Sequence, residues 1–226
     1  MIAAATAPLI IAGCQITFLP GPGGGGIGGQ TTLDRAEAVV SIITPAESTR
    51  AQVRLALETP TGAALILNEE QGIEVNGSAL REESSGLYTR EIDSADTYRF
   101  TVREPTRGVE TTTISGPGAF SLLNPPRDGE ASLSGFTVTW NGADPELDVV
   151  VRVSQTIFGD TATRTFTENS DVGALQLSAA DLSDFVQGAD LTIAVTKIHR
   201  GGSINGIGST TIRIERTRSR TAVPAP

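Results

Sequence analysis

The chain has 226 residues, a formal net charge of −9 and a pI near 4.7. This acidic balance argues against binding nucleic acid through a basic face, and no apolar run reaches the roughly 18 residues that a membrane-spanning helix requires. The single cysteine, Cys14, excludes an internal disulfide and any cysteine-based zinc cluster.

The first feature along the chain is a short apolar run at residues 9–14, which reads LIIAGC. It resembles the lipobox of bacterial lipoproteins, in which the cysteine becomes the lipidated first residue of the mature protein. The resemblance implies that residues 1–13 are a signal-like segment and that Cys14 is the site of lipid attachment. It also implies a place in the cell envelope. An aspartate just after the cysteine would favour retention in the inner membrane, and because this position is Gln15, the resemblance implies the outer membrane.

Residues 1–13 depart from a typical signal peptide because they carry no Lys or Arg. The alternative is a buried strand that ends in a buried thiol. A glycine-rich linker is predicted over residues 14–32, and its 18 residues after the cysteine would span about 25 Å root-mean-square. Gly23, Gly25 and Gly28 match G-x-G-x-x-G, but the dinucleotide-binding form needs a strand before it and a helix after it, and neither is predicted here.

Residues 33–118 read as one block of short strands. Val53, Leu55 and Leu57 alternate with polar residues, and this period of two is typical of a half-buried strand. Asn76-Gly77 predicts a hairpin turn, because both residues tolerate positive φ. Strands are expected at 39–43, 52–58, 64–67, 73–75, 88–92, 98–102 and 108–114.

Gly116-Pro117-Gly118 and Pro125-Pro126 mark a boundary, since proline cannot donate to a strand ladder. The second block is expected over residues 119–217, with a frayed tail at 218–226, and the two blocks are expected to be separable. Its strands are predicted at 136–140, 147–153, 161–168 as an edge strand, 175–177, 191–195 and 210–216. A helical turn is expected at 178–185 and a β-bulge at Lys197, where the apolar alternation breaks.

The fold class that follows is all-β, with two tandem antiparallel sandwiches after the glycine-rich tether. FTVTW at 136–140, LDVVVRV at 147–153 and DLTIAVTKI at 190–198 resemble fibronectin type III and immunoglobulin-like domains. The first block resembles immunoglobulin-like modules of bacterial surface lipoproteins more distantly. The resemblance implies that Trp140 fills the core of the second sandwich.

Few residues offer chemistry. His199 is the only histidine, which excludes a zinc site with two or more histidines, and the nucleophile elbow G-x-S-x-G is absent. Paired carboxylates in predicted turns could serve a glycosidase or bind calcium, with solvated turns as the alternative. The pairs are Glu69 with Glu70, Glu82 with Glu83, and Asp93 with Asp96, and the calcium candidates are Glu69, Glu70, Asp93 and Asp96. No other metal site and no cofactor is expected.

Two further surfaces are candidates for binding. Tyr88 and Tyr98 are left as candidate sugar platforms once Trp140 is assigned to the core. The basic residues near the C-terminus would contact anionic lipid, or would keep an edge strand from pairing with neighbours; they are Arg213, Arg216, Arg218 and Arg220.

The expected function is a non-enzymatic cell-envelope lipoprotein that presents two sandwiches for adhesion, spacing or surface assembly. Its partners would be the membrane, through the lipid anchor, and a protein or glycan at the cell surface, but not nucleic acid. The alternative is a carbohydrate-binding or accessory module of an envelope or secreted enzyme system. A weaker third hypothesis is a hydrolase with a site between the two sandwiches.

Overall fold

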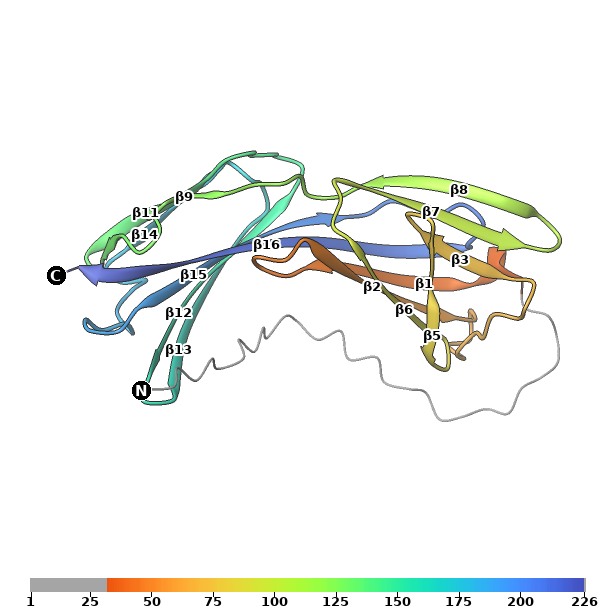
Figure 1. Cartoon of the computed structure of the whole chain (residues 1–226), viewed down its shortest axis with the longest axis horizontal. Coiled ribbons are helices and arrows are strands. Elements are labelled where there is room, and N and C mark those ends of the chain that lie inside the picture. Colours follow the sequence, from red (N-terminus) through yellow and green to blue (C-terminus); the bar gives the residue numbers. More distant parts are fainter. Residues whose placement is uncertain (1–31, 226) are drawn as a thin grey trace, which may run out of the picture.

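The computed structural model describes residues 32–225, and within them the chain is all-β and forms two sandwiches, as the sequence predicts. The signal-like segment, Cys14 and almost all of the glycine-rich tether lie outside the described residues. The sandwiches lie end to end in an elongated molecule (Figure 1). A 3-10 turn, η1 (Leu33–Arg35), precedes the first strand.

One long sheet runs through both sandwiches. Most of its neighbouring strands are antiparallel, but β1 and β10 pair in parallel with β16. In spatial order its strands are β13 (Asp160–Glu168), β12 (Asp148–Ile157), β15 (Leu191–Arg200), β16 (Ser209–Ala225), β1 (Glu37–Thr44), β2 (Arg50–Glu58), β6 (Leu87–Asp93) and β5 (Arg81–Ser84), with β10 (Glu130–Ser132) at the end of β16.

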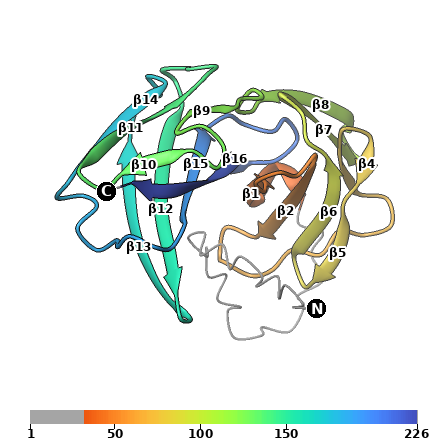
Figure 2. The ribbon, with the colours of Figure 1, turned by 60° about the vertical axis from the view of Figure 1, so that its left-hand side comes forward.

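Two smaller sheets cover this long sheet. The first cover sheet contains β4 (Ser78–Ala79), β3 (Gly72–Val75), β7 (Thr97–Glu104) and β8 (Gly108–Ser115). The second cover sheet contains β14 (Ala174–Ser178), β11 (Gly135–Trp140) and β9 (Leu122–Asn124). Both lie over the same face of the long sheet, since Ile212, Ile214 and Ala222 share one face of β16 by alternation and pack into the two cores (Figure 2).

Strand β16 joins the sandwiches. Residues 209–216 pair with β1 of the first sandwich, and residues 213–222 pair with β15 of the second. The expected frayed tail from residue 218 is therefore wrong, because that segment continues the ladder. The boundaries also differ from the expected ones: Ile204, Ile207, Ile212 and Ile214 come late in the chain but pack in the first core.

Each sandwich has its own buried core. Trp140 is 4% exposed and lies in the second core, which confirms its predicted place. The largest fully buried side chains of the first core include Tyr98, Phe100, Leu55 and Leu57. Those of the second core include Leu177, Leu182, Leu191 and Ile193.

Of four local features expected from the sequence, the structure contains one, the hairpin turn. The hairpin turn is confirmed, since Asn76 and Gly77 have φ of +51° and +74° between β3 and β4. The β-bulge at Lys197 is wrong, because β15 keeps an unbroken register with both neighbours from residue 191 to 198. The segment 64–67 forms only an isolated bridge between Glu58 and Ala64, and residues 179–184 form turns in place of the expected helical turn.

The segment before β1 makes a close backbone contact with the start of β16. The N–H of Gly208 donates to Leu33 O at 3.0 Å, and the N–H of Ser209 donates to Ala36 O at 3.0 Å. A Cβ on Gly208 would lie 2.4 Å from Asp34 O, a backbone atom that cannot rotate away. This glycine therefore lets the segment before β1 dock on the start of β16.

We expect Gly208→Ala to lower the free energy of unfolding by about 1–3 kcal/mol, because overpacking forces the two backbones apart. Gly118→Ala is the matched control, since a Cβ there would meet nothing within 4 Å. Its effect is expected to stay within about 0.5 kcal/mol. Urea unfolding of the two variants measures the difference, and equal midpoints would contradict the close contact.

Candidate functional site

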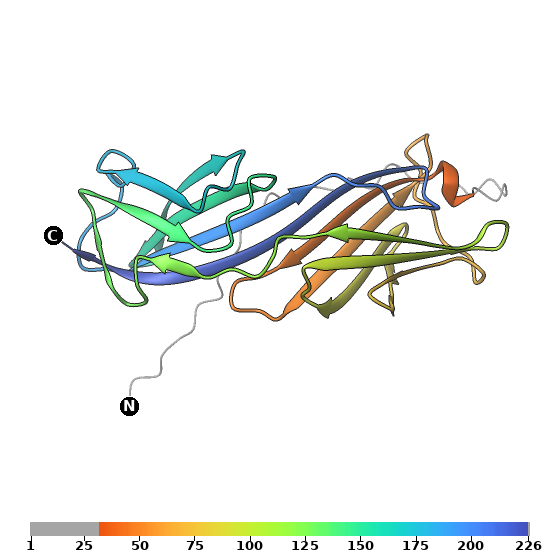
Figure 3. The same ribbon diagram turned by 90° about the horizontal axis from the view of Figure 1, so that it is seen from above.

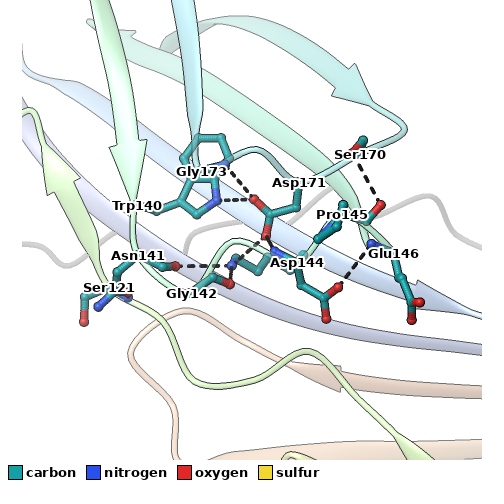
Figure 4. Close-up of polar contacts among 11 residues, drawn as sticks. Ser121, Trp140, Asn141, Gly142, Asp144, Pro145, Glu146, Ser170, Asp171 and Gly173 are labelled. Carbon is teal, nitrogen blue, oxygen red and sulfur yellow. Dashed lines mark hydrogen bonds and ion pairs between the residues drawn. The ribbon is translucent and has the colours of Figure 1, made fainter.

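The most elaborate polar site within residues 32–225 is a buried cluster around Asp171. Asp171 lies in the connection between β13 and β14, Trp140 ends β11, and Lys197 lies on β15. Asp171 and Lys197 are each 1% exposed. Figure 4 shows how the Asp171 carboxylate is surrounded by the ends of these elements.

Each carboxylate oxygen of Asp171 has two partners. Oδ1 accepts from Trp140 Nε1 at 2.6 Å and from the N–H of Gly173 at 3.0 Å. Oδ2 lies 2.7 Å from Lys197 Nζ and accepts from the N–H of Asp144 at 3.3 Å. A buried charge is tolerated only when it is paired and hydrogen-bonded, and Asp171 meets both conditions.

Lys197 has a similarly complete set of neighbours. Nζ also donates to the carbonyl oxygens of Gly142 and Asn141, the latter at 3.3 Å, and it lies 4.8 Å from the centroid of the Phe120 ring. Lys197 lies on the same face of β15 as Leu191, Ile193 and Val195, so it belongs to the buried face and does not break the alternation.

Sequence reasoning missed this cluster, although one signal was present. Lys197 is the single lysine in a chain with 16 arginines, and it stands at an inward position of a strongly apolar strand. Its partner Asp171 could not be inferred, because it lies 26 positions earlier in a loop whose local sequence has no period.

The predicted calcium ligands are not brought together. Glu69 and Glu70 are exposed in a turn, whereas Asp93 lies 2.6 Å from Arg50 Nη1 and Asp96 lies 2.7 Å from Arg216 Nη1. Among the described residues, no three carboxylate, histidine or cysteine side chains are grouped so as to hold a metal ion. Calcium binding by these carboxylates stays a prediction.

The ion pairs of Arg50 lie beside an open depression in the surface, which is lined in part by Pro45, Ser48 and Thr89. The hydrogen bonds that Arg50 donates to Glu91, and then to Asp93, raise the pKa of Arg50. All three charged side chains are largely exposed, so the pairs contribute little to stability. Of the charged residues that line the depression, Arg50 and Glu91 are therefore already paired with each other.

The two tyrosines considered as sugar platforms are core residues, which corrects that expectation. Tyr88 is 4% exposed and Tyr98 is 1% exposed. The Tyr88 hydroxyl accepts from the N–H of Leu67 at 2.7 Å, and burial raises the pKa of Tyr88. Among residues 32–225, the fully exposed aromatic ring is that of Phe158, in the turn between β12 and β13.

Three arginines of the expected basic tail face inward, between the two cores. Arg216 donates to Ser94 Oγ and to Ala95 O as well as to Asp96. Arg218 donates from Nε to Phe120 O, and Arg220 donates from Nη1 to Pro125 O at 3.0 Å. Arg218 thus holds the segment that links the first cover sheet to the second, and Arg220 holds the end of β9. Arg216 instead holds the connection between β6 and β7.

The fourth arginine, Arg213, is paired with Glu215 on the opposite face of β16. An anionic lipid would therefore compete with partners that these arginines already have. The expected alternative, that the basic residues keep an edge strand from pairing, is wrong because β16 is an interior strand.

Within residues 32–225, no helix is long and apolar enough to cross a membrane. No protein-family model matches the chain, and no curated protein matches it in sequence.

Proposed function

We propose that this protein is a non-enzymatic lipoprotein of the bacterial cell envelope, anchored through Cys14, which holds its second sandwich away from the membrane for adhesion, spacing or surface assembly. The observation that carries the proposal is the continuous strand β16, which makes one elongated body of the two sandwiches. A spacer requires a fixed shape more than a reactive centre.

The direction of the molecule supports this proposal. The 3-10 turn η1, in which Leu33 is buried, lies at one end of the first sandwich, and β16 ends at the far end of the second (Figure 3). A chain tethered through residues 14–31 would reach the body at the first of these ends. The second sandwich would then be the part farthest from the membrane.

The far end also carries exposed apolar side chains suited to a partner. Phe158 is fully exposed in the β12–β13 turn, and Val223 is 45% exposed near the end of β16. Val186 is 51% exposed, and its backbone bonds to the side chain of Gln155 near the same end of β12. A partner that covers this end would bury these apolar side chains.

The alternative function, a carbohydrate-binding or accessory module, would use the same end of the molecule. Phe158 offers the exposed aromatic face that neither tyrosine provides. Retention of the protein on an insoluble polysaccharide, lost in Phe158→Ala, would favour this alternative.

We expect Cys14→Ser to move the protein from the membrane fraction to the soluble envelope fraction, with an unchanged circular dichroism spectrum. The reason is that the serine variant would carry no acyl chains, and stable anchoring needs more than one such chain. Fractionation of cells that express the two forms measures the change.

Gln15→Asp is the matched control for this prediction. By the resemblance to lipoproteins, an aspartate after the cysteine favours the inner membrane, so this variant should remain membrane-bound but change membrane. A Cys14→Ser protein that stays in the membrane fraction would contradict the proposed anchor.

A further inference from the structure

We propose that Lys197 and Asp171 become joined by an intramolecular amide bond between Nζ and Cγ. The site has four properties that this reaction requires: a primary amine, a carboxyl group in contact with it, hydrogen-bond donors on the second carboxyl oxygen, and exclusion of water. Lys197 Nζ and Asp171 Oδ2 are 2.7 Å apart, and their side chains are 1% and 0% exposed.

The presence of a lysine at position 197 favours an amide bond over a simple ion pair. The chain uses arginine at every other basic position, 16 in all. An arginine could pair with a buried carboxylate at least as well, since its guanidinium binds carboxylates with two parallel hydrogen bonds. Only a primary amine can form a stable amide with an aspartate, so the single lysine stands where that property matters.

The hydrogen bonds to Asp171 Oδ1 would stabilise the intermediate of the reaction. Attack on Cγ places negative charge on this oxygen, and preorganised N–H donors stabilise such an oxyanion. Trp140 Nε1 at 2.6 Å and the N–H of Gly173 at 3.0 Å already point at it. The N–H of Asp144 donates to Oδ2, the oxygen that leaves.

The reaction needs no co-reactant. A proton passes from the Lys197 ammonium to Asp171 Oδ2, which leaves an amine beside a carboxylic acid. The Nζ lone pair forms the bond to Cγ while the π electrons of Cγ–Oδ1 move onto Oδ1. When they return, the Cγ–Oδ2 bond breaks, and Oδ2 leaves as water with its own proton and one from Nζ.

Burial favours the product over the ion pair. Removing two charges from water carries a desolvation penalty, and the amide is neutral. The product keeps most of the surrounding hydrogen bonds: its oxygen retains both donors, and its single N–H faces the carbonyls of Asn141 and Gly142. The long bond from the N–H of Asp144 is lost with Oδ2. The bond would tie the β13–β14 connection to β15, beside the junction of the two sandwiches.

The sequence provides a direct test by tryptic digestion and mass spectrometry of the purified full chain. Between Arg164 and Arg200 the only cleavage site is Lys197 itself. An amide on Nζ blocks trypsin at Lys197, so the proposal expects a single peptide of residues 165–200, lighter than its sequence by one water molecule. Its fragment spectrum should lack backbone cleavages between residues 171 and 197, which form a ring.

Two peptides, 165–197 and 198–200, at their full sequence masses would overturn the proposal and leave only an ion pair. Loss of water with cleavage after Lys197 retained would also overturn it, because the dehydration would then lie elsewhere. Lys197→Arg is the matched control, since it keeps a cation beside Asp171 but has no primary amine. It is expected to yield residues 165–197 at full mass, and any water loss there would contradict the assignment to Lys197.

Discussion

Deleting residues 209–226 is expected to unfold both sandwiches, although the deleted segment is less than a tenth of the chain. Strand β16 is an interior strand that forms ladders with β1, β15 and β10. It also supplies Ile212 and Ile214 to the first core and Ala222 to the second. Its removal therefore opens both cores and leaves β1 and β15 without their shared neighbour.

The free energy lost with β16 is large compared with the stability of a typical domain. Burial of one large aliphatic side chain contributes about 1.5–3 kcal/mol, and each net backbone hydrogen bond contributes about 0.5–1.5 kcal/mol. Two isoleucines and the ladders with three strands together exceed the total stability of about 5–15 kcal/mol that is typical of a domain. Loss of the cooperative thermal transition, followed by circular dichroism, is the expected result.

Residues 33–118, which the sequence predicts to be an independent domain, also lack the contributions of β16. Without Ile204, Ile207, Ile212 and Ile214 this fragment should not unfold cooperatively. A chain that lacks only residues 223–226 is the control, because it loses the short pairing with β10 and keeps both cores. Cooperative unfolding of the fragment 33–118 would show that β16 is dispensable to the first sandwich.

Asp171→Ala is expected to lower the free energy of unfolding by about 3–5 kcal/mol, because removing one partner of a buried ion pair leaves the other charge uncompensated. The substitution would also leave Trp140 Nε1 and the N–H of Gly173 without their acceptor. An amide bond to Lys197 would add to the loss. Urea unfolding monitored by the fluorescence of the single tryptophan measures the effect.

Asp184→Ala is the matched control, since Asp184 pairs with Arg164 at a similar distance of 2.7 Å but both side chains are more than 40% exposed. Its cost should stay below about 1 kcal/mol. Replacing both partners, as Asp171→Leu with Lys197→Met, should recover part of the stability, because no buried charge remains. Equal effects of Asp171→Ala and Asp184→Ala would show that the buried cluster does not stabilise the fold.

Alternation of apolar residues predicts much of this fold. Phe136, Val138 and Trp140 lie on one strand as expected, and so do Val53, Leu55 and Leu57. These strands face the core on one side and polar surroundings on the other, which is the condition for a clear period of two. The all-β class and the sandwich architecture follow from that pattern.

The same pattern misses two features, the inward arginines of β16 and the buried lysine of β15. Arg218 and Arg220 stand at inward positions of β16, where their donors reach the carbonyls of a segment almost 100 residues away. Lys197 is inward for a similar reason, with a distant carboxylate as its partner. Local alternation treats an inward charged residue as the end of a strand, because the groups that satisfy it are not local in sequence.

The most direct test of the proposed function is mass spectrometry of the N-terminal tryptic peptide from protein extracted from its native membranes. Since no Lys or Arg lies between Cys14 and Arg35, a mature lipoprotein should yield a peptide of residues 14–35. The proposal predicts that this peptide begins at Cys14 and carries more than one acyl chain. An unacylated peptide that begins at Met1 and includes residues 2–13 would contradict both the anchor and the envelope location.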